Sequence, residues 1–117
     1  GGFQMTIQEL GTIFQTKIPV KIVVLNNEFL GMVRQWQELF FDKRYASTTM
    51  VNPDFQKIVK GYDIKTKKVT ERDQLNESVQ EMLEFEGAYF LEVMVGKENN
   101  VFPMVPTGAS VSEIRLK

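Results

Sequence analysis

The feature that most constrains the fold is a short run of apolar, mostly β-branched residues at positions 20–25, which ends directly in two asparagines. A run of this length and composition is typical of a strand that is covered on both faces in a parallel sheet. Lys21 interrupts the run, and we expect its side chain to lie in solvent where the strand begins. Because open α/β sheets bind ligands where their parallel strands end, the pair Asn26-Asn27 marks a candidate site.

Helices are predicted before and after this strand. Thr6 and Glu9 have the spacing of a capping box, so a helix is expected to begin near Thr6. Apolar residues recur at helical spacing between Gly31 and Phe40 and predict a second helix there. Asn52 followed by Pro53 predicts the start of a third helix, with Asn52 as its N-cap.

The second half of the chain continues the alternation of strands and helices. A weak strand pattern at 64–69 is followed by a helical pattern that starts near Leu75 and by a clear strand pattern at 88–95. This order predicts an α/β fold, a parallel sheet flanked by helices. Three strands are few for such a sheet, so we expect the fold to be truncated at its N-terminal side. We assign residues 1–95 to this domain and residues 96–117, where Pro and Gly recur, to its irregular C-terminal tail.

Composition excludes several classes of partner and site. With 14 basic and 15 acidic residues the net charge is −1, so neither nucleic acid nor an anionic membrane is an expected partner. The chain contains no cysteine and no histidine, which excludes thiolate metal sites and removes the commonest general base. No apolar run approaches the roughly 20 residues that a membrane-spanning helix needs. We therefore expect a cytoplasmic protein whose chemistry depends on carboxylates, amides, backbone groups and groups borrowed from elsewhere.

Two features near the strand are candidates for binding a phosphorylated ligand and its metal. The amide oxygen of Asn27 suits a hard cation such as Mg²⁺, although asparagines after a strand more commonly form a turn. Gly1 and Gly2 would let backbone N–H groups approach a diphosphate. The alternative for these glycines is that they have no role beyond forming a terminus.

Four further side chains have both a functional and a structural interpretation. Met32 and Trp36 lie one helical turn apart, and they either line an apolar pocket for a small substrate or pack in the core. Glu92 lies within an otherwise apolar strand pattern, where an unpaired carboxylate would be costly to bury. It is expected either to hydrogen-bond to a backbone turn or to face a gap at the sheet edge. Arg34 is expected to be exposed, and contact with an anion is the alternative.

Several segments closely resemble the C-terminal thiamine diphosphate domain of the acetohydroxyacid synthase (acetolactate synthase) catalytic subunit. The family motif is Gly-Asp-Gly, a spacer, and Asn-Asn. Gly1 matches the last glycine of this motif, and Asn26-Asn27 closes it. The other segments that carry the resemblance are Gly2-Phe3-Gln4-Met5, Ile18-Pro19-Val20-Lys21-Ile22 and Gly31-Met32-Val33-Arg34-Gln35-Trp36-Gln37.

The resemblance implies a role for each matching position. Thiamine diphosphate would be bound by Gly1, Gly2, Asn27, Leu30, Gly31 and Met32. Mg²⁺ would be bound by the side chain of Asn27 and the carbonyl of Phe29, and the substrate channel would be lined by Met32 and Trp36. No residue of the chain itself is implied to be catalytic. The aspartate of the motif, a metal ligand, and the activating glutamate of a partner subunit both lie outside it.

The implied enzyme is a thiamine diphosphate-dependent transferase that condenses pyruvate with pyruvate or 2-ketobutyrate in branched-chain amino acid biosynthesis. It would be a homo-oligomer of the catalytic subunit, with a regulatory small subunit as a further partner and FAD in a domain that this chain lacks. We expect the chain alone to be inactive. Two alternatives stay open: another thiamine diphosphate enzyme, of the pyruvate oxidase or carboligase type, and a non-catalytic flavodoxin-like interaction domain.

Overall fold

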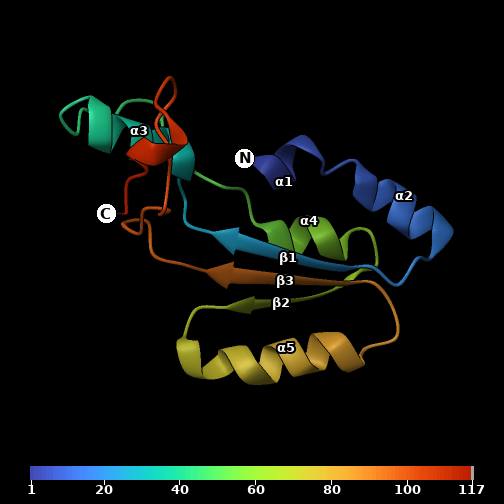
Figure 1. The fold of residues 1–117 in the computed structure, drawn as a ribbon. Coiled ribbons are helices and arrows are strands. Elements are labelled where there is room, and N and C mark those ends of the chain that lie inside the picture. Colours follow the sequence, from blue (N-terminus) through green and yellow to red (C-terminus); the bar gives the residue numbers. More distant parts are fainter. Residues whose placement is uncertain (117) are drawn as a thin grey trace.

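The computed structural model describes residues 1–116, and its centre is a three-stranded parallel sheet (Figure 1). The strands are β1 (Lys21–Asn26), β2 (Lys65–Val69) and β3 (Tyr89–Met94), in the order β1-β3-β2. Both outer strands pair with β3 in parallel, and the register sets Asn26 of β1 opposite Met94 of β3. The predicted α/β fold with a parallel sheet is therefore confirmed.

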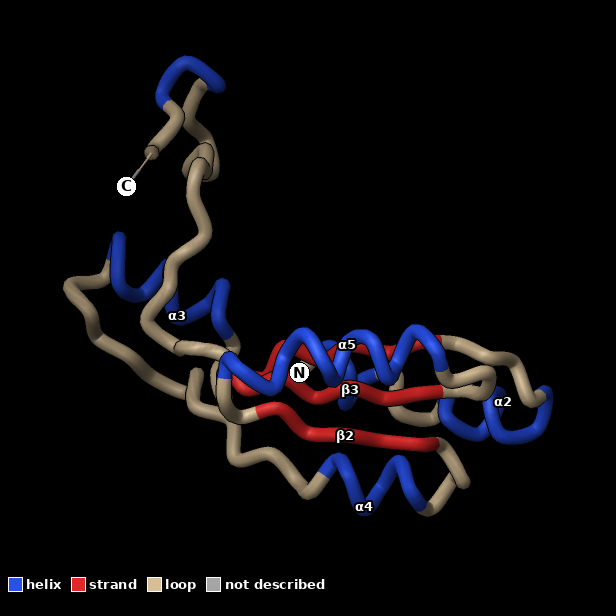
Figure 2. The backbone as a smooth tube through the Cα atoms, turned by 90° about the horizontal axis from the view of Figure 1, so that it is seen from below, coloured by secondary structure: helices blue, strands red, loops and turns tan. Residues whose placement is uncertain are grey.

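Helices cover both faces of this sheet. They are α1 (Gly2–Met5), α2 (Glu9–Thr16), α3 (Gly31–Phe40), α4 (Phe55–Lys60) and α5 (Leu75–Glu84), with short 3-10 turns η1 (Arg72–Gln74) and η2 (Val111–Glu113). α1, α2 and α4 pack on one face and α5 on the other (Figure 1). α3 and the C-terminal tail lie beyond the carboxyl ends of the strands (Figure 1, Figure 2), which makes the molecule elongated, 46 × 27 × 26 Å.

Each face of the sheet has its own apolar core, because successive side chains of a strand point to opposite faces. On the face covered by α1, α2 and α4, Phe90 packs in a cluster with Leu10 and Phe55. On the other face, Leu91 packs in a cluster with Met82 of α5. β3 is the central strand, and for that reason its first four residues are all buried.

β1 is covered less completely than its sequence predicts. The side chains of Val23 and Leu25 are 49% and 67% exposed, because they face the α5 side, where α5 packs over β2 and β3. The expectation that this strand is covered on both faces is therefore wrong. Lys21 is not free in solvent either, since its ammonium donates to the carbonyls of Phe85 and Gly87, the latter at 2.6 Å, just after α5 ends.

The segment before β1 forms two short helices instead of one helix that begins near Thr6. No capping box forms there. The Thr6 hydroxyl donates backwards to the Gly2 carbonyl at 3.2 Å, and the Glu9 carboxylate accepts from the Thr12 hydroxyl at 3.2 Å. The predicted start is wrong because Thr6 is the C-cap of α1, and the next helix, α2, begins three residues later at Glu9 with Gln8 as its N-cap.

The N-cap of α4 also differs from the prediction. Asp54 caps this helix by accepting from the Lys57 amide at 3.1 Å. Asn52, two residues earlier, makes its hydrogen bonds to side chains of α1 and β1. A tertiary contact therefore replaces the local cap that the Asn-Pro pair predicts.

α5 is tied to the edge strand β2 by a single carboxylate. Glu81 accepts from the ammonium groups of Lys65 and Lys67, each at 2.8 Å. The hydrogen bond from Lys65, followed by that from Lys67, lowers the pKa of Glu81 from the ordinary value of 4.5 to about 2. The charged form of Glu81 therefore stabilises the packing of α5 on the sheet.

The contribution of Glu81 to the stability of the fold should decrease as the pH falls. Because its pKa is lower in the folded chain, its stabilisation is present above pH 4.5 and is lost as the pH falls towards about 2. We expect Glu81→Gln to lower the Tm by about 2–4 °C at pH 7, since ion pairs with this much exposure are weak. The difference from wild type should shrink below pH 4.5. Thermal melts across this range test it, with Glu84→Gln on the same helix as control; a difference that persists unchanged at low pH contradicts it.

Candidate functional site

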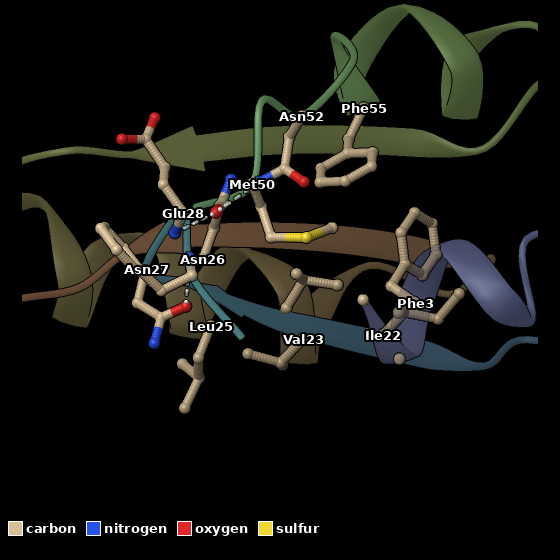
Figure 3. Close-up of a pocket in the computed structure, with 14 residues that line it drawn as sticks. Phe3, Ile22, Val23, Leu25, Asn26, Asn27, Glu28, Met50, Asn52 and Phe55 are labelled. Carbon is tan, nitrogen blue, oxygen red and sulfur yellow. Dashed lines mark hydrogen bonds between the residues drawn. The ribbon is translucent and has the colours of Figure 1, made fainter. Parts of the chain in front are cut away.

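A pocket of about 380 Å³ lies at the carboxyl end of β1 (Figure 3). We call it the strand-end pocket. Its walls come from α1, from β1 and the turn after it, and from the loop that leads into α4. Gly1, Gly2, Asn26, Asn27 and Phe29 all line it. The glycines at the start of the chain and the asparagine pair therefore meet at one site, as the position of the asparagines at a strand end suggests.

The two asparagines point in opposite directions (Figure 3). Asn26 is buried: its Nδ2 donates to Glu92 Oε1 at 2.8 Å, and its Oδ1 accepts from Asn52 Nδ2 at 2.9 Å. Asn27 is half-buried, and its Oδ1 accepts only from the backbone amide of Phe29, at 3.1 Å. Sequence reasoning singled out Asn27 and missed Asn26, although the alternation of side chains along a strand predicts that only one of two neighbours faces inward.

The turn after β1 depends on a residue in an unusual backbone conformation. Glu28 has a φ of 58°, in the left-handed region that non-glycine residues rarely adopt. Its amide donates to Asn26 Oδ1 at 3.0 Å, and its carbonyl accepts from the Met50 amide at 2.7 Å. Phe29 forms an antiparallel bridge with Thr49. The loop at 48–50 therefore holds the turn in place from the outside.

A second pocket, of about 340 Å³, shares Gly1, Gly2 and Phe29 with the first. We call it the α1–α3 pocket. Leu30, Gly31 and Met32 complete most of its wall, so the residues that the resemblance assigns to the cofactor surround two adjoining pockets. The Leu30 amide donates to the Thr48 carbonyl at 2.8 Å. The amides of Gly31 and Met32 belong to the first turn of α3, whose N–H groups have no carbonyl partner within the helix.

At two glycines of the α1–α3 pocket, the side chain of another residue lies close to the glycine main chain. A Cβ on Gly31 would lie 2.9 Å from Nδ2 of Asn27, and a Cβ on Gly1 would lie 3.0 Å from Cδ2 of Leu30. Separations this short leave no room for a side chain unless the neighbour moves. Glycine at these positions lets the starts of α1 and α3 lie this close to their neighbours.

Buried Arg34 ties α3 to the tail. Its guanidinium pairs with Glu98 at 2.7 Å and with Glu38 at 3.0 Å, and it stacks over the Tyr45 ring at 4.6 Å. The expectation of an exposed arginine is wrong, because Tyr45 of the segment after α3 and Glu98, 64 positions away in the sequence, both pack against it. The Tyr45 hydroxyl donates to Glu38 at 2.9 Å, and this hydrogen bond is the main cause that lowers the pKa of Glu38 below its usual value.

Gln35, the other buried residue of α3, pairs with the tail backbone. Its Nε2 donates to the Val101 carbonyl at 3.0 Å, and its Oε1 accepts from the Val101 amide at 2.7 Å. Met32 and Trp36, one turn apart on α3, are less buried than Arg34 and Gln35. Met32 is 51% exposed at the α1–α3 pocket, whereas the half-buried Trp36 lines neither pocket and stacks on Phe40 with ring centroids 4.8 Å apart.

Glu92 is buried in the central strand rather than at an edge. Its carboxylate accepts from Asn26 Nδ2 at 2.8 Å and from Gln56 Nε2 at 3.0 Å, and it pairs with Lys68 at 3.4 Å. The two expected environments, a backbone turn and a gap at the sheet edge, are therefore both wrong. The buried Glu92 carboxylate is instead paired with side chains from β1, α4 and β2.

The part of the chain that the structure describes offers few alternatives for a metal site. Within residues 1–116 no group of three or more acidic side chains could hold a metal ion. A cation at the strand-end pocket would therefore depend on amide and carbonyl oxygens, together with groups from elsewhere. No helix in the same range is both long and apolar enough to cross a membrane.

Residues 1–93 match the family described as thiamine pyrophosphate enzyme, C-terminal TPP binding domain. Among curated proteins, the chain is 46% identical to the acetolactate synthase isozyme 2 large subunit of Escherichia coli, over all of the chain and 22% of that protein. It is 43% identical to the mitochondrial acetolactate synthase of Schizosaccharomyces pombe, over 97% of the chain and 17% of that protein. It is 40% identical to the acetolactate synthase large subunit of Porphyra purpurea, over 96% of the chain and 19% of that protein.

The chain thus spans about a fifth of the length of these relatives. Its match to the family description covers the strand-end pocket, the α1–α3 pocket and all three strands except the last residue of β3. The chain therefore belongs to the thiamine pyrophosphate enzymes, as a C-terminal TPP-binding domain.

Proposed function

We propose that this chain is part of a thiamine diphosphate-dependent acetolactate synthase. This enzyme is a transferase that condenses pyruvate with pyruvate or 2-ketobutyrate in branched-chain amino acid biosynthesis. The observation that carries the proposal is the convergence of Gly1, Gly2, Asn27, Gly31 and Met32 on two adjoining pockets at the carboxyl end of β1. The names of the similar proteins, all acetolactate synthases, support the choice of reaction.

The residues present fit a diphosphate. A Cβ on Gly1 or Gly31 would meet the side chain of Leu30 or Asn27, and the lack of a Cβ at both positions leaves their main chain uncovered beside the pocket. We propose that the amides of Gly1, Gly2, Gly31 and Met32 bind the diphosphate. At α3 the helix N-terminus adds a favourable field for the negative charge. Leu30 would contribute from the pocket wall, because its amide is already bonded to Thr48.

The residues also fit a hard cation beside that diphosphate. Asn27 Oδ1 accepts one hydrogen bond, from Phe29, and an amide oxygen has a second lone pair to offer. We propose Asn27 Oδ1 and the Phe29 carbonyl oxygen as ligands of Mg²⁺, because this cation prefers oxygen ligands. When bound, thiamine diphosphate supplies the carbanion chemistry of the reaction. The residues of this chain would hold and orient it and exclude water from its surroundings.

The substrate channel is proposed to run past α3. Met32 lies at the α1–α3 pocket, and Trp36 follows one turn later on the same side of the helix. A large aromatic ring there would favour the acceptor ketoacid with the longer side chain. We also propose that residues 1–95 form the cofactor-binding part and that 96–117 are its tail, because Arg34 and Gln35 bond the tail to α3.

The remaining features of the whole protein are proposals of the same kind. We propose a cytoplasmic homo-oligomer of catalytic subunits in which another domain binds FAD and a partner subunit supplies the activating glutamate. A regulatory small subunit is a further candidate partner. An enzyme of the pyruvate oxidase or carboligase type remains the second candidate function, since such enzymes also belong to the thiamine diphosphate class.

The reaction can be tested in the full-length protein that carries this domain. We expect it to form acetolactate from pyruvate only when both thiamine diphosphate and Mg²⁺ are present. The purified 117-residue chain should form none, because the aspartate of the motif and the activating glutamate lie outside it. Chromatographic detection of acetolactate measures the activity of the full-length protein and of the isolated chain. Product from the isolated chain, or its absence from the full-length protein with both cofactors, would refute the proposal.

The metal assignment predicts a specific defect for Asn27→Ala in the full-length protein. Loss of one oxygen ligand should raise the Mg²⁺ concentration needed for half-maximal thiamine diphosphate binding by at least ~10-fold. A Mg²⁺ titration followed by calorimetry measures the change. Asn76→Ala, at an exposed position of α5, is the matched control and should leave the titration unchanged. An unaltered Mg²⁺ requirement in Asn27→Ala would exclude the side chain as a ligand.

The channel assignment predicts a change in acceptor preference for Trp36→Leu. Removing the large ring should lower the preference for 2-ketobutyrate over pyruvate by about 10-fold, which is typical for losing apolar contact with a small group. Trp36→Phe keeps an aromatic ring and should give an intermediate ratio. Competition between the two ketoacids, read as the ratio of products, measures the effect. An unchanged ratio in Trp36→Leu would place Trp36 outside the channel.

A further inference from the structure

Three side-chain amides form a chain of hydrogen bonds that all run in one direction. Gln4 Nε2 donates to Asn52 Oδ1 at 2.8 Å, and Asn52 Nδ2 donates to Asn26 Oδ1 at 2.9 Å. Asn26 Nδ2 then donates to Glu92 Oε1 at 2.8 Å. We call this series the amide chain. It links α1, the loop before α4, β1 and β3, and it ends on a buried carboxylate.

The carboxylate of Glu92 sets the direction of the amide chain. A carboxylate only accepts hydrogen bonds, whereas each amide has one accepting and one donating end. Asn26 must therefore turn its NH₂ towards Glu92 and its oxygen towards Asn52 and the amide of Glu28, which donates to it at 3.0 Å. If Asn26 were reversed, its NH₂ would face the Glu28 N–H, and two donors would meet.

The amide chain connects both halves of the proposed cofactor site. At one end, Gln4 belongs to α1, the short helix that follows Gly1. At the other end, Asn26 holds the amide of Glu28, whose left-handed conformation shapes the turn that carries Asn27 and Phe29. Figure 3 shows Asn26 turned towards Asn52 while Asn27 points the other way. The side chain of Asn26 therefore fixes the turn, and the side chain of Asn27 stays available for the proposed metal ion.

We propose that Glu92 is a positioning residue for the cofactor site. Through Asn26 and Asn52, its buried carboxylate holds the metal-binding turn at a set position relative to the glycines of α1. The proposal deepens the proposed function and rests on it, because it concerns the same site. Glu92 itself does not contact the ligand. The competing interpretation is that Glu92 only stabilises the sheet, and the experiments separate the two.

The first experiment uses Glu92→Met in the full-length protein. Methionine has similar bulk and removes both acceptors, so the NH₂ of Asn26 loses its partner. We expect the Kd values for Mg²⁺ and thiamine diphosphate, measured by calorimetry, to rise by at least ~10-fold. In the cofactor-free protein, hydrogen exchange of the Glu28 amide should also become faster by at least ~10-fold. Glu92→Gln keeps one oxygen that can accept from Asn26, and it should show a smaller loss in both measurements.

A matched control corrects for a general loss of stability. Val93→Ala changes the next residue of β3, whose side chain packs in the cluster on the α5 face, away from the amide chain. It should lower the Tm but leave both Kd values and the relative exchange of the Glu28 amide unchanged. If Glu92→Met behaves like Val93→Ala, the carboxylate is only structural and the proposal is overturned.

An exchange of donor and acceptor provides the sharpest test. Asn26→Asp alone places two carboxylates against each other and should weaken cofactor binding. In the double variant with Glu92→Gln, the carboxylate at position 26 accepts from Asn52, from the Glu28 amide and from the new amide at position 92. Binding should then return to within about 3-fold of wild type, as expected for coupled neighbours. A double variant as weak as Asn26→Asp alone overturns the proposal.

The outcome also distinguishes this proposal from the proposed function. If the wild-type protein binds no thiamine diphosphate, the proposed function fails. Exchange of the Glu28 amide still reports on the turn in that case: faster exchange in Glu92→Met supports the positioning role, and unchanged exchange overturns it. If the wild type binds the cofactor and Glu92→Met binds it equally well, only the positioning role fails.

Discussion

The hydrogen bond between Asn26 on β1 and Glu92 on β3 is the interaction on which the rest of the site depends. Burying an unpaired carboxylate would cost several kcal/mol. Glu92 avoids this because Asn26, Gln56 and Lys68 approach it from three elements. Two of these partners are held in turn, Asn26 by Asn52 and Gln56 by the Thr66 hydroxyl, which donates to Gln56 Oε1 at 2.6 Å. A charge that is costly to bury therefore specifies how the carboxyl ends of the strands, α4 and the turn after β1 fit together, and the adjoining pockets follow from that arrangement.

A second set of polar contacts places α3 beyond the end of the sheet. Arg34 and Gln35 are buried there, and they bond to Glu98 and Val101 of the tail. These contacts join α3 to the tail, and at the start of the helix Met32 lines the α1–α3 pocket and is 51% exposed. The first residues of α3 and the glycines at the start of α1 line this same pocket. This arrangement supports the proposed diphosphate site and the proposed substrate channel past α3.

Much of the fold was predictable from short-range pattern. The apolar run at 20–25, the helical spacing at 31–40 and the strand at 88–95 are local signals, and each forms the predicted element. The errors at Asn52 and Arg34 share a physical cause. Local rules place Asn52 at a helix start and Arg34 on the surface, yet both bond to residues far away in the sequence. No spacing rule can anticipate such partners. A polar side chain that could cap a helix or lie in solvent can instead be satisfied by a hydrogen bond or an ion pair to a residue far away in the sequence.

The amino-acid sequence by itself determined the order of strands and helices, the parallel sheet and the placing of the candidate site at the end of β1. These depend on the periodicity of side chains along helices and strands, which is written in the sequence. Only the tertiary structure decided that Asn26 faces inward and Asn27 outward, that Glu92 ends a chain of amides, and that Val23 is left uncovered. The reason is that the register between β1 and β3, which sets Asn26 opposite Met94, brings the Asn26 amide within reach of Glu92, a residue 66 positions away in the sequence.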